Sequence, residues 1–194
     1  PMNSLPTAMI ENTTFDEITM GQSATMLRTL TNADIQAFAA VSGDTNPAHL
    51  DADYADHTLF HGVIAHGMWG GALISALLGT VFPGPGTIYL EQNLLFSRPI
   101  RIGDTLEITV TVIALDAEKK RVDLDCLIKN QKGERVLFGI AKVMAPTQKV
   151  RRPQSNAPRI QLFDPQARLQ SLLDMGKGQP AVVCAIVHPC DSES

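Results

Sequence analysis

The sequence has 194 residues, 44% of them hydrophobic, which allows one ordinary domain and a short additional segment. A formal net charge of −4 gives no basic footprint for nucleic acid, and three cysteines without a C-x-x-C spacing predict neither a disulfide framework nor a cysteine metal site. Because the sequence shows no apolar run of membrane-spanning length and no secretion signal, we expect a cytoplasmic protein that does not bind membranes.

The first predicted elements are a strand at 23–30 and a helix that follows it directly. Thr31 and Asp34 have the spacing of a capping box, which marks a helix start. Apolar residues then recur at helical spacing. Gly43 is placed to end this helix, because glycine readily adopts the left-handed conformation found at helix ends.

A polar loop at 42–51 follows the helix and holds a carboxylate and an imidazole five residues apart, Asp44 and His49. Glycine, asparagine and proline are turn formers, so we expect neither helix nor strand here. Aspartate and histidine are the usual pair for moving protons near neutral pH. A surface loop with a capping aspartate would have the same spacing, and from these residues alone both interpretations stay open.

A second helix is predicted from about Trp69 to Phe82, with side chains that are nearly all apolar or very small. A helix that is apolar on every face must be enclosed, and about 15 residues are too few to span a bilayer. We therefore expect a sheet wrapped around it. Gly67 then lies at the start of a buried helix, where unpaired N–H groups at the positive end of the dipole form a site for an oxyanion.

Four candidate strands follow, at 87–96, 105–113, 121–129 and 135–144, and short connections between the last three suit antiparallel neighbours. Alternation predicts one-sided apolar sets in each strand: Ile88, Leu90, Leu94 and Phe96, then Leu106, Ile108, Val110 and Val112, then Val122, Leu124, Cys126 and Ile128, and finally Val136, Phe138 and Ile140. The pattern predicts an α+β fold in which a curled antiparallel sheet surrounds one buried helix.

Two stretches carry a specific resemblance to a known family. Residues 38–51 read Phe-Ala-Ala-Val-Ser-Gly-Asp-Thr-Asn-Pro-Ala-His-Leu-Asp, and residues 64–68 read Ile-Ala-His-Gly-Met. They resemble the MaoC-like (R)-specific enoyl-CoA hydratases, which have the hot-dog fold. The resemblance implies a hot-dog domain at 15–146 that reversibly hydrates trans-2-enoyl-CoA to (R)-3-hydroxyacyl-CoA, without a cofactor or a metal.

The resemblance also implies the roles of individual residues. Asp44 and His49 would act on a water, the Gly67 N–H would polarise the thioester carbonyl, and Ser75 would lie near the substrate. The substrate would be an acyl-CoA thioester. Two such sheets would join side by side, so we expect a homodimer or a higher homo-oligomer, in which pairing relieves the exposed sheet edge.

The other histidines and two arginines have less specific interpretations. His57, His61 and His66 lie near acidic residues, but their spacings match no standard zinc pattern. We interpret His57 and His61 as loop groups. His66 could face the substrate, but a histidine bonded to the backbone beside the helix start is the commoner case. Arg98 and Arg101 suit phosphate groups, although solvated strand ends are the commoner place for such residues.

Two alternatives to hydration stay open. A hot-dog acyl-CoA thioesterase would use the same water to attack the thioester carbonyl. A non-catalytic module for acyl-CoA binding or assembly would instead support a downstream domain. The residues do not indicate the acyl chain length, the preferred direction, or whether coenzyme A or an acyl-carrier protein bears the acyl group.

From Ala145 onward the composition changes. Residues 147–160 are polar and proline-rich, as in a linker, and an apolar run at 181–187 is typical of a buried parallel strand. Residues 161–194 resemble the start of a phosphate acetyltransferase/butyryltransferase domain. We therefore interpret the chain as the hydratase part of a bifunctional enoyl-CoA hydratase/phosphate acetyltransferase, and we expect a chain that ends at about Pro146 to keep its hydratase activity.

Overall fold

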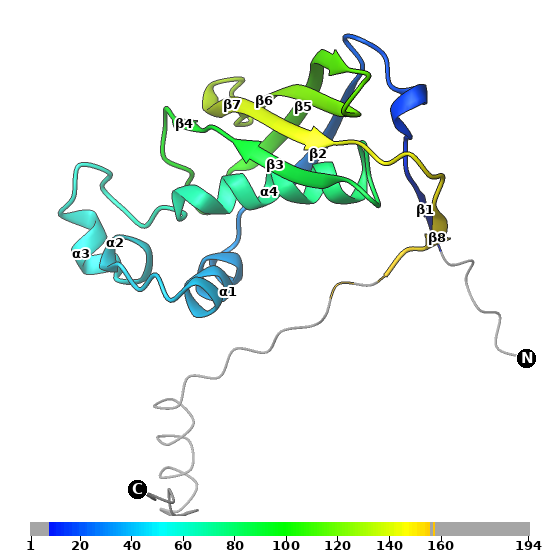
Figure 1. Cartoon of the computed structure of the whole chain (residues 1–194). Helices are drawn as coiled ribbons and strands as arrows, with labels where there is room; N and C mark the ends of the chain where they lie inside the picture. Colours follow the sequence, from blue (N-terminus) through cyan, green and yellow to red (C-terminus); the bar gives the residue numbers. More distant parts are fainter. Residues whose placement is uncertain (1–7, 156, 158–194) are drawn as a thin grey trace, which may run out of the picture. The chain divides into compact units, whose positions relative to one another are not determined.

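A curved antiparallel sheet packed on one long helix, α4 (Gly67–Thr80), forms the body of the fold (Figure 1). The computed structural model describes residues 8–155 and 157. The strands follow the order β2-β5-β6-β7-β3, β4 also pairs with β7, and all these pairs are antiparallel. The predicted α+β architecture is thereby confirmed.

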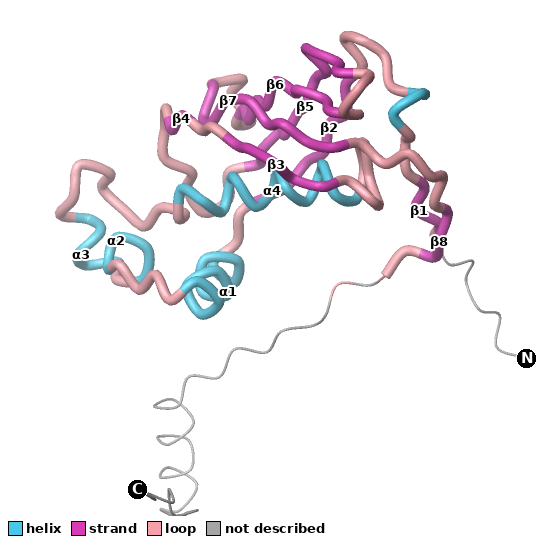
Figure 2. Tube along the Cα trace, in the orientation of Figure 1, coloured by secondary structure: helices cyan, strands magenta, loops and turns pink. Residues whose placement is uncertain are grey.

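The elements begin and end close to where the sequence predicts them. The strands of the main sheet are β2 (Ser23–Thr29), β3 (Ile88–Gln92), β4 (Leu95–Phe96), β5 (Thr105–Asp116), β6 (Arg121–Lys129) and β7 (Arg135–Met144). The remaining helical elements are η1 (Phe15–Glu17), α1 (Asn32–Ser42), α2 (Pro47–Leu50) and α3 (Ala52–Asp56). Figure 2 shows α1, α2 and α3 together on the side of α4 that faces away from the strands. The Thr31 and Asp34 capping box and the left-handed Gly43 at φ 75° delimit α1 as expected.

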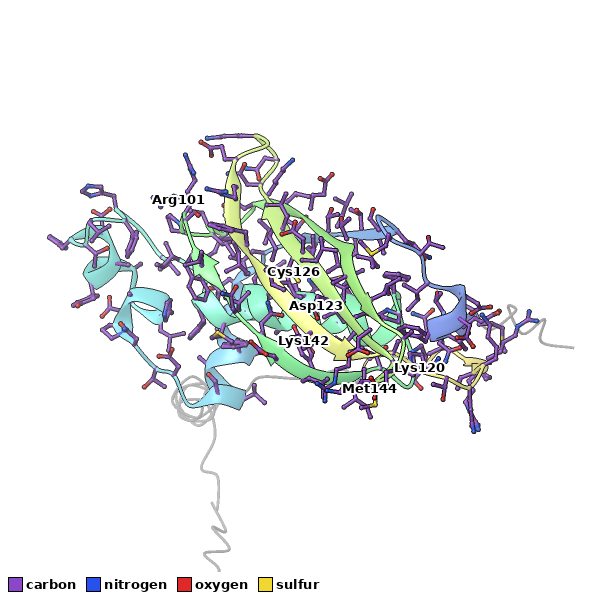
Figure 3. All side chains as sticks on the ribbon, turned by 45° about the horizontal axis from the view of Figure 1, so that its top comes forward. Arg101, Lys120, Asp123, Cys126, Lys142 and Met144 are labelled. Carbon is purple, nitrogen blue, oxygen red and sulfur yellow. The ribbon has the colours of Figure 1, made fainter. Side chains whose placement is uncertain are left out.

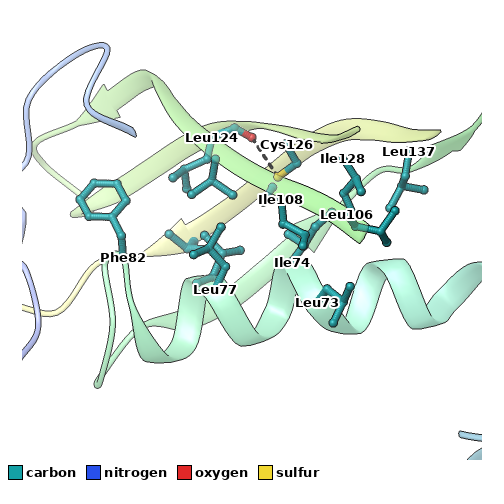
Figure 4. Packing of buried hydrophobic residues seen from close by; sticks show 14 of the residues in the cluster. Leu73, Ile74, Leu77, Phe82, Leu106, Ile108, Leu124, Cys126, Ile128 and Leu137 are labelled. Atoms are coloured by element: carbon teal, nitrogen blue, oxygen red, sulfur yellow. Dashed lines mark hydrogen bonds between the residues drawn. The ribbon is translucent and has the colours of Figure 1, made fainter. Parts of the chain in front are cut away.

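The core lies between α4 and the inner face of β5 and β6. All eight side chains in the predicted inner sets of these two strands are at most 1% exposed, which confirms those sets. Figure 4 shows Leu73, Ile74 and Leu77 of α4 pointing toward them. Burial raises the pKa of the Cys126 thiol to about 11, so this cysteine is a packing residue and not a nucleophile at neutral pH. On the outer face of the sheet, Asp123 and Lys142 form a cross-strand ion pair at 3.8 Å (Figure 3).

The predicted inner face of β7 is wrong beyond its first residue. Val136 is buried as expected, but Ile140 is 45% exposed and Phe138 shares its outer face. The buried residues that follow in this strand are Leu137, Gly139, Ala141 and Val143. Val136 is an extra residue between two successive β6–β7 pairs, which makes it a β-bulge. One extra residue moves every later side chain to the opposite face, and alternation alone does not reveal it.

The strand predicted at 87–96 is divided into β3 and β4 at Asn93. The Asn93 N–H donates to the carbonyl oxygen of Ile140, and the Asn93 side-chain oxygen accepts the Ile140 N–H at 3.1 Å. A Cβ on Gly139 would overlap the Asn93 carbonyl, so glycine permits this close approach. β3 forms an edge of the sheet, and its apolar side chains are exposed, Ile88 by 54%.

Within the described residues, α4 is not enclosed on every side, contrary to expectation. The sheet covers Leu73, Ile74 and Leu77, but Met68 is 57% exposed and Ser75 also faces outward. Most other residues on this outward face are glycine or alanine, so composition does not distinguish it from a buried face. The helix therefore has one covered and one open side.

The range predicted as a linker, 147–160, begins with ordered structure. Its strand β8 (Arg151–Pro153) pairs antiparallel with β1 (Met9–Glu11), which precedes the expected start of the domain. The predicted second domain, 161–194, and its apolar run lie outside the described residues. The ordered structure thus extends beyond the predicted range 15–146 at both ends, to β1 and to β8.

Asn12 attaches the β1–β8 pair to the body and is only 2% exposed. Its Nδ2 donates to the carbonyl oxygens of Pro85 and Gln148, both at 2.9 Å. Its Oδ1 accepts the Val150 N–H at 2.9 Å. Lys149 adds a bond to the Asn12 carbonyl oxygen at 2.7 Å. Because a buried amide must be hydrogen-bonded, the segment after Pro146 contributes to the stability of the fold.

We predict that a chain ending after Pro146 is less stable than a chain ending after Ser155 by about 1–3 kcal/mol, since Asn12 loses its partners Gln148 and Val150 and the β1–β8 pair cannot form. Urea unfolding followed by circular dichroism measures this difference. Equal midpoints for the two shortened chains would contradict the role given to Asn12.

Candidate active site

The polar loop at 42–51 contains one short helix, α2, where neither helix nor strand was expected, and α3 follows it directly. Asn46 caps α2, since its Oδ1 accepts the Ala48 N–H at 3.0 Å, and Pro47 occupies the first helical position. Asp44 in turn accepts the Asn46 N–H at 3.2 Å. The turn formers of the loop therefore also start a short helix, and this helix carries His49.

His49 is half-buried and held in one orientation. Its Nδ1 lies 2.8 Å from the carbonyl oxygen of Ile64. A carbonyl oxygen can only accept, so Nδ1 carries the proton, and the neutral ring keeps a lone pair on Nε2. His49 can therefore accept a proton or hold a water through Nε2.

His66 lies beside His49 and is buried, as its 2% exposure shows. Its Nε2 donates to the main-chain carbonyl oxygen of Asp44 at 2.9 Å. This bond confirms the interpretation of His66 as a histidine bonded to the backbone. The rings of His66 and His49 stack with centroids 3.9 Å apart and planes 31° apart, and the Phe38 ring lies 5.0 Å from that of His66.

These elements bring Asp44, His49 and His66 together. A carboxylate oxygen and one nitrogen of each ring lie within 4.8 Å of one another. One nitrogen of each ring is committed to a carbonyl oxygen, which leaves one further nitrogen on each ring. A carboxylate and an imidazole at this separation suit proton transfer through a water. The expectation that the site holds no metal stays a prediction.

Gly67 lies at the start of α4, next to the two histidines. Its N–H has no hydrogen-bond partner among the described residues, as expected for the first helical position. A Cβ at this position would lie 3.0 Å from the ring of Phe96. The glycine therefore lets this ring approach while keeping the N–H accessible.

His49 and Gly67 both line a cavity of about 260 Å³, which we call the His49 cavity. The rest of its lining is largely apolar and includes Phe60, Ile64, Phe96, Ile100, Val136 and Leu137. An apolar wall around a few polar groups is typical of a small-molecule site. The sequence pattern did not identify Phe96 as part of it, because Phe96 lies about thirty positions from Gly67 in the chain.

Ser75 lies apart from this cavity in the single chain. It lines a groove of about 340 Å³ on the open side of α4, together with Phe38, Met68, Gly71, Ala72, Tyr89, Gln92 and Leu94. We call this the Ser75 groove. The structure thus places exposed Asp44 beside His49 and places His49 in one cavity with Gly67. Asp44 does not line that cavity, and Ser75 lines a separate groove.

Two arginines lie around the His49 cavity. Arg98 lines it, and its Nε is 3.6 Å from a carboxylate oxygen of Glu134. Arg101, at the end of the sheet in Figure 3, donates to the carbonyl oxygen of Phe60 at 2.5 Å. Both guanidinium groups are partly exposed, so solvent screens their charge.

Among the helices that the structure describes, none combines the length and the apolar character needed to cross a membrane.

Comparison with known proteins places this geometry in a family. Residues 15–129 match the model of the MaoC like domain. An (R)-specific enoyl-CoA hydratase of Rhodospirillum rubrum is 49% identical over 134 residues, which cover 68% of this chain and 91% of the relative. A 3-hydroxybutyryl-CoA dehydratase of Methylorubrum extorquens is 40% identical over 132 residues, covering 68% of this chain and 83% of the relative. The unliganded structure of an R-hydratase from Pseudomonas aeruginosa superimposes with a TM-score of 0.77 at 44% identity, covering 80% of this chain and all (100%) of that one.

Proposed function

The chain belongs to the MaoC-like domain family, and we propose that it is an (R)-specific enoyl-CoA hydratase that reversibly converts trans-2-enoyl-CoA to (R)-3-hydroxyacyl-CoA. The observation that carries the proposal is that an Asp–His pair lies next to an unpaired N–H at the start of a helix. A carboxylate oxygen of Asp44 and a ring nitrogen of His49 lie within 4.8 Å of each other, and His49 shares a cavity with Gly67. The names of the hydratase and dehydratase relatives support the same reaction.

The Gly67 N–H would stabilise the charge that develops during the reaction. When a water attacks C3 of an enoyl thioester, the electrons of the double bond move toward the carbonyl, and negative charge collects on the thioester oxygen. An unpaired N–H at the positive end of α4 stabilises that charge. Because the helix is fixed by its core packing, this donor needs no rearrangement when the charge appears.

Asp44 and His49 would act on the attacking water. The water oxygen bonds to C3, the water proton passes to the pair, and a proton is delivered to C2 on the same face of the substrate. We assign Asp44 as the base and His49 as the partner that orients the water or relays the proton. The lone pair on His49 Nε2 suits both of these roles.

The substrate of this reaction would be an acyl-CoA thioester that also contacts Ser75. The Ser75 groove runs along the same helix that begins at Gly67, from Met68 to Ser75 about two helical turns further on, so an acyl group held at the N-terminus of α4 can extend along it. The absence of a cofactor, the cytoplasmic location and the second, phosphate acyltransferase-like domain at 161–194 all stay predictions.

The function is tested by incubating the protein with a short trans-2-enoyl-CoA. We expect loss of the conjugated double bond, no release of free thiol, and (R)-3-hydroxyacyl-CoA as the product. Absorbance follows conjugation, a thiol reagent follows hydrolysis, and chiral chromatography identifies the product. Thiol release without hydration would instead identify a thioesterase, and no conversion would favour a binding or assembly module.

In the same assay, Asp44→Asn and His49→Gln should each lower kcat by about 10²–10⁴, the usual effect of removing a positioned acid or base. Circular dichroism should show an unchanged fold. Asp53→Asn, in the exposed helix α3 nearby, is a matched control that should keep wild-type turnover. If either site variant also keeps wild-type turnover, the assignment of that residue is wrong.

The Gly67 N–H can be removed without disturbing its helix. Proline suits the first helical position, and the preceding His66 has φ −58° and ψ 133°, the extended conformation that a residue before proline requires. We predict that Gly67→Pro lowers kcat about 10²–10³-fold relative to Gly67→Ala. Gly67→Ala keeps the N–H while adding a similar contact with Phe96. Equal turnover of the two variants would exclude the proposed role of this N–H.

We also propose that the chain forms at least a homodimer through the free edge of β3. An edge strand exposes unpaired N–H and C=O groups, and pairing with a second copy satisfies them. The side chains of β3 make this edge apolar, since Ile88, Tyr89 and Leu90 are all exposed. The open side of α4, with exposed Met68, adjoins this edge across the Ser75 groove. The opposite edge strand, β2, exposes a single large apolar side chain, Leu27.

Light scattering at micromolar concentration should give at least twice the 21.0 kDa mass of the single chain. Ile88→Lys should shift the protein toward the monomer, because it places a charge within the proposed interface. The matched control is Leu27→Lys, on the opposite edge of the same sheet, which should leave the mass unchanged. A wild-type monomer, or dissociation by Leu27→Lys instead, would contradict this interface.

A further inference from the structure

We propose that His66 is a positioning residue of the hydration reaction, a role that rests on the proposed function. His66 contacts both members of the Asp44–His49 pair, through one hydrogen bond and one ring contact. Both contacts hold these residues in place. His66 acts through the main chain of Asp44 and through the ring of His49. The inference goes beyond the roles assigned above to Asp44, His49 and Gly67.

The first contact fixes the position of the loop that carries Asp44. Among the hydrogen bonds of the described residues, the other bonds made by residues 43–47 join positions no more than four apart. The bond from His66 Nε2 to the Asp44 carbonyl oxygen spans 22 positions, at 2.9 Å. Among the described residues it is therefore the hydrogen bond that ties residues 43–47 to the start of α4, whereas Ala48 and His49 bond to Ile64.

The second contact fixes the ring of His49. One face of this ring stacks on His66 with centroids 3.9 Å apart, while its Nδ1 is bonded to the carbonyl oxygen of Ile64. Ile64 and His66 belong to the same short segment that leads into α4. Both rotation of the ring and its distance from Asp44 are thus set by residues 64–66, immediately before Gly67.

The hydrogen bonding of His66 favours a role as a donor to the main chain over a role as a proton carrier. Its Nε2–H is held by a carbonyl oxygen, and its buried Nδ1 has no hydrogen-bond partner among the described residues. A proton on Nδ1 would lack an acceptor there. A buried acceptor without a partner, such as this Nδ1, lowers the stability of the fold. An apolar side chain at position 66 would therefore be more stable if the Nε2–H had no role. The donor is therefore what a histidine supplies at this position.

Two substitutions separate the donor from the ring. His66→Gln keeps an N–H at the ε position but loses the stacked ring, while His66→Phe keeps a ring but loses the donor. We expect each to lower kcat about tenfold to a hundredfold, with KM within about threefold of wild type, because a small displacement of a catalytic group has effects of this size. The matched controls are His57→Gln and His57→Phe, since His57 Nδ1 also bonds a carbonyl oxygen, that of Asp53 at 2.7 Å, but in an exposed position.

A measurement on the wild-type protein makes the proposal independent of whether the variants fold. Nitrogen-15 NMR at neutral pH should show His66 protonated at Nε2 alone and His49 protonated at Nδ1 alone. A proton on His66 Nδ1 would overturn the proposal, as would folded His66 variants with wild-type kcat or with a loss confined to KM. If the wild-type protein shows these tautomers but no hydration, the proposed function is wrong and the catalytic role of His66 falls with it.

Discussion

The packing of α4 against the inner face of β5 and β6 is the interaction on which the rest of the structure depends. The eight inner side chains of these strands are essentially inaccessible, and full burial of each such aliphatic side chain is worth about 1.5–3 kcal/mol. Gly70 lets the helix approach closely, because a Cβ there would lie 3.1 Å from Leu137. The first turn of the helix is therefore held tightly, and with it the N–H of Gly67.

The site extends outward from this fixed helix end. Residues 64–66 lead into the helix, and each histidine of the stacked pair bonds a carbonyl oxygen: His49 that of Ile64, and His66 that of Asp44. Two main-chain acceptors thus determine which nitrogen of each ring carries a proton. A loop of turn-forming residues gains a defined geometry because a rigid scaffold holds it, which is the usual relation between catalytic loops and the fold beneath them.

The sequence predicts best the features that depend on local chemistry. The caps of α1 and the inner faces of β5 and β6 follow from hydrogen-bonding and alternation rules that act over a few residues. The bulge at Val136 depends on how β7 pairs with β6, so no pattern within 135–144 reveals it. In the same way, Asp44, His49 and Gly67 were identified from the loop, the helix start and a family resemblance. The tautomers of the two histidines and the wall formed by Phe96 depend on contacts between distant segments, so they required the structure.

The division between the His49 cavity and the Ser75 groove has a physical explanation in the proposed dimer. Both hollows adjoin α4, but the groove lies on the open side of this helix, bounded by Tyr89 and Gln92 of the free strand β3. A second copy that pairs along β3 would cover the groove and exclude water from its apolar wall. An acyl chain that extends from the N-terminus of α4 into this groove would then be removed from water. The same pairing that satisfies the edge of the sheet would therefore also complete the environment in which the acyl thioester reacts.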